Sequence, residues 1–169
     1  MVSITQKITP CLWFDAQAED AANFYTSVFD GGRIKQVSRY GKAGQDVHGK
    51  EPGSVMVVEF EIAGQTFTAL NGGPQFRFSE AVSFQVMCES QEEIDRFWSK
   101  LSDGGQQGQC GWLKDRYGLS WQIVPSVLPQ MITNARGVEL DRIIAAVMEM
   151  KKFDVAALRR AAAGEIEKV

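Results

Sequence analysis

The chain has 169 residues, of which 44% are hydrophobic and 23% are charged, and these are the proportions of a folded globular protein. Its formal net charge of −3 comes without any basic block, so we expect no nucleic-acid partner. Residues 1–7 lack the apolar core of a signal peptide and no apolar run is long enough to cross a bilayer, so we expect a cytoplasmic protein without membrane contact.

The first half of the chain predicts one helix among four strands. Ala21, Phe24, Tyr25, Val28 and Phe29 follow the spacing of a single buried helix face, and the glycine pair 31–32 should end that helix. The strand-like runs span residues 8–14, 33–40, 54–62 and 65–71, with Gly64 at the turn between the last two.

A glycine-rich polar stretch, residues 41–53, interrupts these strands, and we expect it to be a mobile loop. It contains His48, the only histidine of the chain. A Ser-His-Asp triad would have to use this residue, and a histidine-rich zinc or iron site cannot be built. The three cysteines, Cys11, Cys88 and Cys110, form no CxxC pair and fit reduced thiols.

The second half repeats this order. Ile94, Phe97, Trp98 and Leu101 mark another amphipathic helix, and Ser90 should be its N-cap, with Glu93 completing a capping box. The strand-like runs span residues 81–88, 106–110, 111–114 and 119–125, and the turn 115–118 joins the last two.

A constant shift of 73 residues relates the two halves, because it takes Phe24 to Phe97 and Gly31 to Gly104. An internal repeat of this kind predicts one structural unit used twice. We therefore expect an α+β fold of two β-α-β-β-β modules, about residues 5–74 and 78–127, that form a cupped mixed sheet. This places a domain at residues 1–128, followed by a helical extension at residues 129–169.

The extension carries two predicted helices. Leu140, Ile143, Ile144, Val147 and Met148 mark one amphipathic helix, and a short alanine-rich helix opens at residues 153–154 and runs through residue 163. Two prolines, at positions 125 and 129, separate this tail from the preceding strands. Its apolar faces must pack either on its own domain or on a second subunit.

Several segments resemble the PhnB-like branch of the vicinal oxygen chelate superfamily, which includes glyoxalase I and the bleomycin-resistance proteins. They are residues 9–15 (TPCLWFD), 24–29 (FYTSVF), 69–74 (ALNGGP), 110–125 (CGWLKDRYGLSWQIVP) and 148–154 (MEMKKFD). The resemblance spans nearly the whole chain and implies the two-module fold and assembly as a homodimer.

This branch often carries the label 3-demethylubiquinone-9 3-methyltransferase, which would imply methyl transfer from S-adenosylmethionine. Such enzymes normally use a doubly wound sheet with a glycine-rich turn after its first strand. Here the glycine pairs 31–32 and 104–105 follow predicted helices instead. Methyl transfer is therefore an alternative rather than the main interpretation.

The resemblance also implies where a metal would bind in the metal-dependent members, which use His and Glu ligands from equivalent strands. Those positions fall on Ser83 and Gln122 in the second module, and on Thr9 or Pro10 and the range 68–71 in the first. None is His, Asp or Glu, and a divalent first-row cation needs imidazole, thiolate or carboxylate donors. We therefore expect no metal and no cofactor.

Side-chain alternation along strands defines the candidate pocket. Ser83, Gln85 and Met87 should face the cavity, whereas Val82, Phe84 and Val86 should meet the helix. On the last strand Ser120, Gln122 and Val124 should share one face, and at least one of Trp13, Trp112 and Trp121 should line the pocket. Glu59 and Glu61 alternate on one strand, so they either place a carboxylate in the cavity or face solvent. The candidate pocket residues are Trp13, Glu59, Asn71, Ser83, Gln85, Trp112 and Gln122.

Three functional hypotheses follow. The first is a metal-free protein that binds a small aromatic or otherwise apolar molecule, because the lining is aromatic with a few amides and hydroxyls. The second is an enzyme of small-molecule metabolism, either a metal-dependent lyase or isomerase or the methyltransferase of the label. The third is an interaction module that works through its tail helices.

Overall fold

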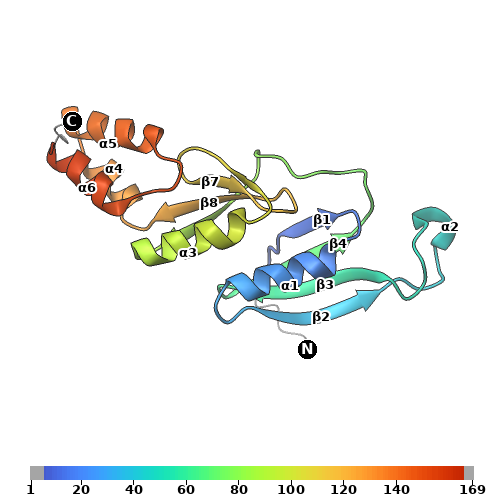
Figure 1. The fold of residues 1–169 in the computed structure, drawn as a ribbon. Coiled ribbons are helices and arrows are strands. Elements are labelled where there is room, and N and C mark those ends of the chain that lie inside the picture. The colour runs from blue at the N-terminus through green and yellow to red at the C-terminus, as the bar shows by residue number, and fades with distance from the viewer. Residues whose placement is uncertain (1–5, 166–169) are drawn as a thin grey trace. The chain divides into compact units, whose positions relative to one another are not determined.

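The computed structural model describes residues 6–165. These residues divide between positions 77 and 78 into two compact units, each of which contains one module. The α+β class and the repeated β-α-β-β-β order are both confirmed (Figure 1). Each module forms a four-stranded mixed sheet of its own. The predicted boundary between a domain at 1–128 and an extension at 129–169 stays a prediction.

The first unit consists of the strands β1 (Cys11–Phe14), β2 (Arg33–Arg39), β3 (Val55–Ile62) and β4 (Gln65–Asn71) with the helix α1 (Ala18–Val28). The strand order is β1-β4-β3-β2, and β1 runs parallel to β4 while the other pairs are antiparallel. Helix α1 covers one face of this sheet (Figure 1), where the Tyr25 and Phe60 rings stack with centroids 5.9 Å apart. Among residues 6–77, no helix covers the other face.

The stretch 41–53 differs from the expected loop, because it contains the short helix α2 (Gln45–His48). Gly44 and Gly49 flank this helix and both adopt left-handed backbone angles, which glycine accepts without steric cost. The His48 ring lies 4.6 Å from the Tyr40 ring, and its Nδ1 atom accepts a hydrogen bond from the Lys50 backbone.

The second unit repeats the plan with β5 (Phe84–Cys88), α3 (Gln91–Ser102), β6 (Gln106–Gln107), β7 (Trp112–Lys114) and β8 (Ser120–Pro125). The order is β5-β8-β7-β6, again with one parallel pair, β5 with β8. Helix α3 starts as predicted, since the Ser90 hydroxyl accepts a hydrogen bond from the Glu93 backbone, 3.2 Å away. The predicted turn is also present, because the Gly118 backbone donates to the Asp115 carbonyl.

Two predicted strands of this unit are shorter than expected. The strand expected from residue 81 starts at Phe84, and Val82, which we expected to meet the helix, lies before it and is 66% exposed. The strand expected over 106–110 ends at Gln107, because Cys110 and Gly111 both take positive φ angles. A tight turn replaces its second half, and the Trp112 backbone donates to the Gln109 carbonyl there.

The tail contains the two expected helices, α5 (Val138–Glu149) and α6 (Val155–Ala163), and one that the sequence analysis missed, α4 (Leu128–Asn134). Pro129 was interpreted as a linker signal but lies in the first turn of α4, where a missing backbone N–H has no cost. The tail packs within its own unit, at one end of the second sheet (Figure 1). Its apolar core joins Val124 of β8 to these buried residues: Leu128, Ala135, Ile143, Phe153 and Leu158. No helix among residues 6–165 is long and apolar enough to span a membrane.

Gly111 fixes how closely the tail approaches the sheet. Its φ angle is +78°, and a Cβ atom there would lie 2.5 Å from Cε2 of Phe153 and 2.7 Å from the Ile123 carbonyl oxygen. Gly118 has a similar φ angle of +85° but has no atom within 4 Å of the same position. An alanine at position 118 would therefore add backbone strain alone, whereas an alanine at position 111 would add both strain and steric overlap.

We predict that Gly118→Ala lowers the free energy of unfolding by about 1–2 kcal/mol through strain alone. Gly111→Ala should cost about 1–3 kcal/mol more, because Phe153 must move out of the tail core. Urea-induced unfolding of the two variants measures the difference. Equal losses would show that the tail does not pack tightly on this glycine.

Cys88, at the end of β5, is 1% exposed. Burial raises the pKa of its thiol from 9.0 to about 11, and the Glu93 carboxylate acts in the same direction. The thiolate therefore forms at a lower pH in the unfolded chain than in the folded one, so stability from this group is complete below pH 9 and is lost as the pH rises toward 11.

We predict that the free energy of unfolding falls between these pH values by up to about 3 kcal/mol through Cys88. Cys88→Ala should show a shallower decline over the same range, since its side chain does not titrate. Unfolding curves recorded at half-unit pH steps test this. Parallel pH profiles for the two proteins would contradict it.

Candidate functional site

Within residues 78–165, the face of the second sheet opposite α3 is free of helices except at Val124, where the tail packs, and we call it the helix-free face. It brings together four of the predicted pocket residues. Gln85, Gln122 and Trp112 occupy one row across β5, β8 and β7, because Gln85 pairs with Gln122 and Gln122 pairs with Trp112. Ser83 lies just before β5 and joins them through the Gln122 amide, whose Nε2 atom donates to the Ser83 hydroxyl at 2.8 Å. Alternation predicted this arrangement, since Phe84, Val86 and Cys88 point the opposite way, toward α3.

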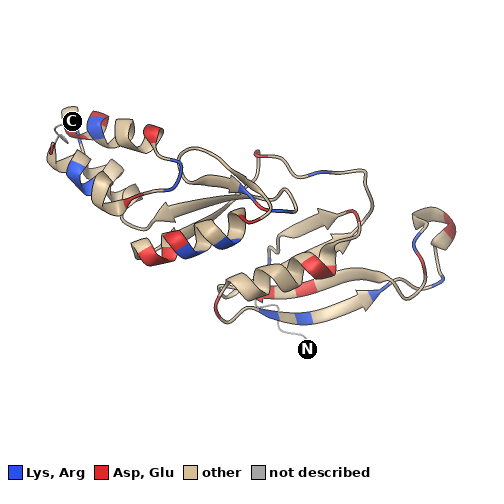
Figure 2. Cartoon of the chain, viewed as in Figure 1, with Lys and Arg blue, Asp and Glu red and all other residues tan. Residues whose placement is uncertain are grey.

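A chain of neutral polar groups runs along this face. Gln85 Nε2 donates to Gln122 Oε1 at 3.3 Å, so the Gln122 amide links Ser83 to Gln85. Gln85 is exposed, whereas Ser83 and Gln122 are half-buried. Strand β8 itself carries no charged residue (Figure 2). The face therefore offers amide and hydroxyl hydrogen-bonding groups without a fixed charge in this row.

The three strand tryptophans lie in different surroundings. Trp121 is buried on the α3 side, where its Nε1 donates to the Asp115 carboxylate at 2.8 Å, so it belongs to the core. Trp112 is half-buried on the helix-free face, and its indole N–H has no hydrogen-bond partner among the described residues. Trp13 is half-buried in the first unit, and its Nε1 donates to the Gly73 carbonyl at 2.8 Å. Trp112 is thus the tryptophan with a free polar group next to the amide row.

The first unit divides its predicted residues between two faces. Trp13 and Glu59 lie on the helix-free face, since the paired residues of β1, β4 and β3 point alternately to each side. Asn71 pairs with Phe14 and lies on the α1 side, only 6% exposed. Its Oδ1 accepts from the Ala18 backbone at 2.8 Å and its Nδ2 donates to the Val55 carbonyl at 3.1 Å. Its amide therefore holds the start of α1 against the sheet.

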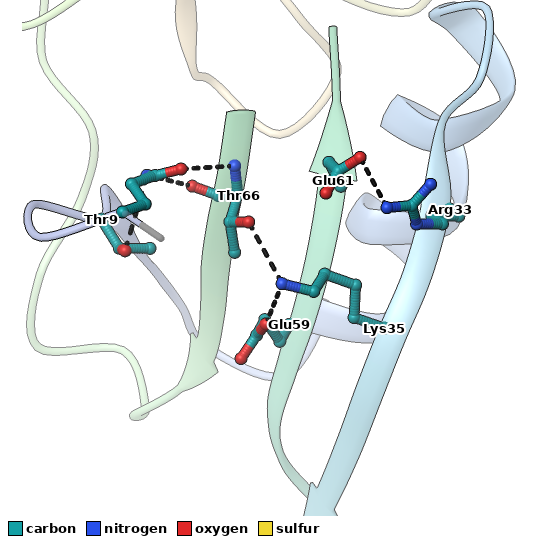
Figure 3. A network of polar contacts seen from close by, with 7 residues as sticks. Thr9, Arg33, Lys35, Glu59, Glu61 and Thr66 are labelled. Atoms are coloured by element: carbon teal, nitrogen blue, oxygen red, sulfur yellow. Dashed lines mark hydrogen bonds and ion pairs between the residues drawn. The ribbon is translucent and has the colours of Figure 1, made fainter. Parts of the chain in front are cut away.

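Glu59 and Glu61 share a face, as their alternation predicts, and each is paired with a cation from β2 (Figure 3). Glu59 lies 2.6 Å from Lys35 Nζ, and Glu61 lies 2.9 Å from Arg33. Lys35 also donates to the Thr66 hydroxyl at 3.3 Å. Both carboxylates are thus paired with cations of their own sheet, and Glu59 belongs to a group of ion pairs on its surface.

A cavity of about 450 Å³ lies in the first unit, between the start of α1 and the stretch 49–55. Its wall includes the acidic side chains of Asp15, Glu19, Asp20 and Glu51. Of the predicted pocket residues it contains only Asn71, whose amide is hydrogen-bonded to the Ala18 and Val55 backbones. The aromatic and amide lining predicted for the pocket is therefore not found here.

The donor set does not fit a divalent first-row cation. Within the described part of the chain, no three His, Cys, Asp or Glu side chains gather to hold a metal ion. At the positions implied by the resemblance, Ser83 and Gln122 are hydrogen-bonded to each other, and the Asn71 amide is bonded to backbone. Neutral oxygens of this kind are weak ligands for such cations.

The fold also does not fit the usual site for S-adenosylmethionine. Each described sheet has four strands and a single parallel pair, so neither is doubly wound. The glycine pairs 31–32 and 104–105 follow α1 and α3, as the sequence analysis predicted, and do not form a phosphate-binding or nucleotide-binding turn after a first strand.

Comparisons with known proteins agree with the fold. The family model described as 3-demethylubiquinone-9 3-methyltransferase matches residues 6–124. The PhnB protein from Bacillus cereus is 38% identical, with 71% of this chain and 99% of that chain covered and a TM-score of 0.63. A protein from Pseudomonas aeruginosa is 19% identical, with 72% and 98% covered and a TM-score of 0.57, which shows a common fold.

A more distant structure is the fosfomycin resistance protein FosX from Listeria monocytogenes, at 15% identity, 78% and 98% coverage and a TM-score of 0.49. At that similarity nothing of its chemistry is transferred to this chain. No protein of curated function matches the chain. The family match over most of the chain and the similarity to PhnB place this protein in the 3-demethylubiquinone-9 3-methyltransferase family, within the PhnB-like branch of the vicinal oxygen chelate superfamily.

Proposed function

We propose that this protein binds a small aromatic or apolar molecule without a metal, on the helix-free face of its second sheet. The observation that supports this most directly is the row of Gln85, Gln122 and Trp112, extended by Ser83. An aromatic ring beside a few fixed hydrogen-bonding groups suits an apolar ligand that must be oriented. The unpartnered indole N–H of Trp112 supplies a donor that the fold does not use.

Gln122 carries the specificity in this proposal. Its amide already donates to Ser83 and accepts from Gln85, so its position and orientation are fixed before a ligand arrives. A preorganised polar group binds more tightly than a free one, because little side-chain entropy is lost on binding. The amide retains hydrogen-bonding capacity beyond these two contacts, since it has two N–H groups and two oxygen lone pairs.

An enzyme that uses a metal or S-adenosylmethionine is the alternative, and the two functions differ in a measurable way. In the binding protein proposed here the affinity should not depend on a metal. We therefore predict that small aromatic compounds quench or shift the tryptophan emission of the protein in a saturable way. The protein for this titration is purified without a histidine tag and treated with a chelator. A stoichiometric Ni, Zn, Fe or Mn in untreated protein, lost together with binding on chelation, would contradict the proposal.

Variants locate the site. Trp112→Phe should remove most of the ligand-dependent fluorescence change, whereas Trp13→Phe should retain it. Gln122→Met, which keeps the side-chain length, should weaken binding about tenfold through one lost hydrogen bond to the ligand. Gln36→Met, at an exposed position of β2, is the matched control and should bind as the parent does. Identical affinities for the Gln122 and Gln36 variants would move the site elsewhere.

A further inference from the structure

The hydroxyl group of Ser120 is the unusual polar group of the second unit. The residue is 0% exposed, and its Oγ atom has no hydrogen-bond partner among the described residues. Burial of a hydroxyl without a partner costs free energy, so such a group in a native protein calls for a partner, either a water molecule or a ligand. Alternation along the strand predicts that Ser120 shares a face with Gln122, although Ser120 is not among the predicted pocket residues.

Ser120 lies in the wall of a cavity of about 150 Å³. The other lining residues are Glu80, Gln106, Gln107, Gly108, Trp112, Leu113 and Lys114. A cavity of about this volume in another protein holds one benzene molecule. The space is thus suited to a single six-membered ring with a small substituent, next to the Trp112 ring of the proposed binding face.

Lys114 supplies the one positive charge of this lining. It pairs with Ser120 across β7 and β8, so the two side chains lie on the same face. Its Nζ atom lies 2.5 Å from Oε1 of Glu80, a residue of the turn that precedes β5. The Glu80 side chain is 62% exposed and is not part of a strand, so its carboxylate can leave without moving the sheet.

The Lys114 ammonium group favours a carboxylate partner at this point. The hydrogen bond from Lys114 holds the pKa of Glu80 below its ordinary value. An exposed ion pair of this kind is weak, because water competes for both partners. A ligand carboxylate that also meets a buried, unpartnered hydroxyl would gain a hydrogen bond that Glu80 does not make.

We propose that this cavity binds a small aromatic carboxylate, whose carboxylate replaces that of Glu80 on Lys114 and accepts a hydrogen bond from Ser120 Oγ while its ring lies beside Trp112. This inference rests on the proposed function and names its ligand class. A monoanion matches the site, because it would replace the single carboxylate, that of Glu80, with which Lys114 is paired. In this proposal Lys114 supplies the positive charge, the Ser120 hydroxyl orients the carboxylate through a hydrogen bond, and Trp112 supplies the apolar contact.

Benzoate and its neutral analogue benzyl alcohol are the probes, measured by isothermal titration calorimetry on the full chain. We expect benzoate to bind about tenfold more tightly than benzyl alcohol, since a hydrogen bond to a charged group is stronger than one between neutral groups. Lys114→Met should remove that preference. Lys152→Met is the matched control, because Lys152 forms an ion pair of the same length, 2.5 Å, with Asp95 outside the cavity.

Two further variants separate a binding role from a structural one. Glu80→Gln should tighten benzoate binding about threefold, because the competing carboxylate is gone. Ser120→Ala should weaken it about threefold or more and at the same time raise the melting temperature of the ligand-free protein, because an unpartnered buried hydroxyl is removed. A serine with a purely structural role would lower that temperature instead.

The outcomes distinguish this inference from the proposed function. Equal affinities for benzoate and benzyl alcohol, both lost in Trp112→Phe, would overturn the carboxylate site and leave the binding protein intact. A Ser120→Ala variant that is less stable and binds benzoate as the parent does would also overturn it, since the hydroxyl would then serve the fold or a bound water. No saturable binding of either probe or of the wider aromatic panel would overturn both.

Discussion

The pairing register of β8 determines which side chains the second unit presents on the face opposite α3. This central strand runs parallel to β5 and antiparallel to β7, and α3 covers one face of all three. Because successive side chains of a strand point to opposite faces, Trp121 and Ile123 must enter the core once α3 is in place, and Gln122 must point away from it. A shift of one residue would bury the glutamine amide and expose the tryptophan, at a cost that no other contact offsets. Burial of one face thus determines which side chains form the proposed binding face on the other.

Much of this fold could be predicted from the sequence, because the helices and hairpins depend on neighbours close in the chain. The apolar spacing of α3 and its Ser90 cap are local signals, and so is the turn at Gly64. Failures occurred where the local signal had two meanings. Pro129 marks either a linker or the first turn of a helix, and only the packing of α4 under the tail decides between them. The start of β5 depends on its partner strand, which the sequence around Val82 does not identify.

The candidate site also combines features that local sequence signals predict with features that depend on distant parts of the chain. Alternation within one strand predicted correctly that Gln85 shares a face opposite Phe84, and the pairing of β5 with β8 then joined Gln85 to Gln122. Asn71 was predicted to line the pocket, but it ends the buried face of β4 that Phe67 and Ala69 form, and its pairing with Phe14 places it on the α1 side. Ser120 was correctly expected to share a face with Gln122 but was not among the predicted pocket residues. What distinguishes it is a missing hydrogen-bond partner, and this property exists only once the surrounding chain is in place.

Different groups border the two ends of the β8 face, and they limit the size of the proposed ligand. At one end Val124 is buried in the tail core with Phe153, so the face cannot extend past Gln122 in that direction. At the other end the Glu80–Lys114 pair stands at the cavity that contains Ser120. Between them lies a short half-buried stretch around Gln122 and Trp112. The tail helices therefore do more than stabilise the unit, because they also set the length of the proposed binding face. The ligand proposed for that face is accordingly small, and it gains its affinity from a few oriented contacts rather than from a large apolar area.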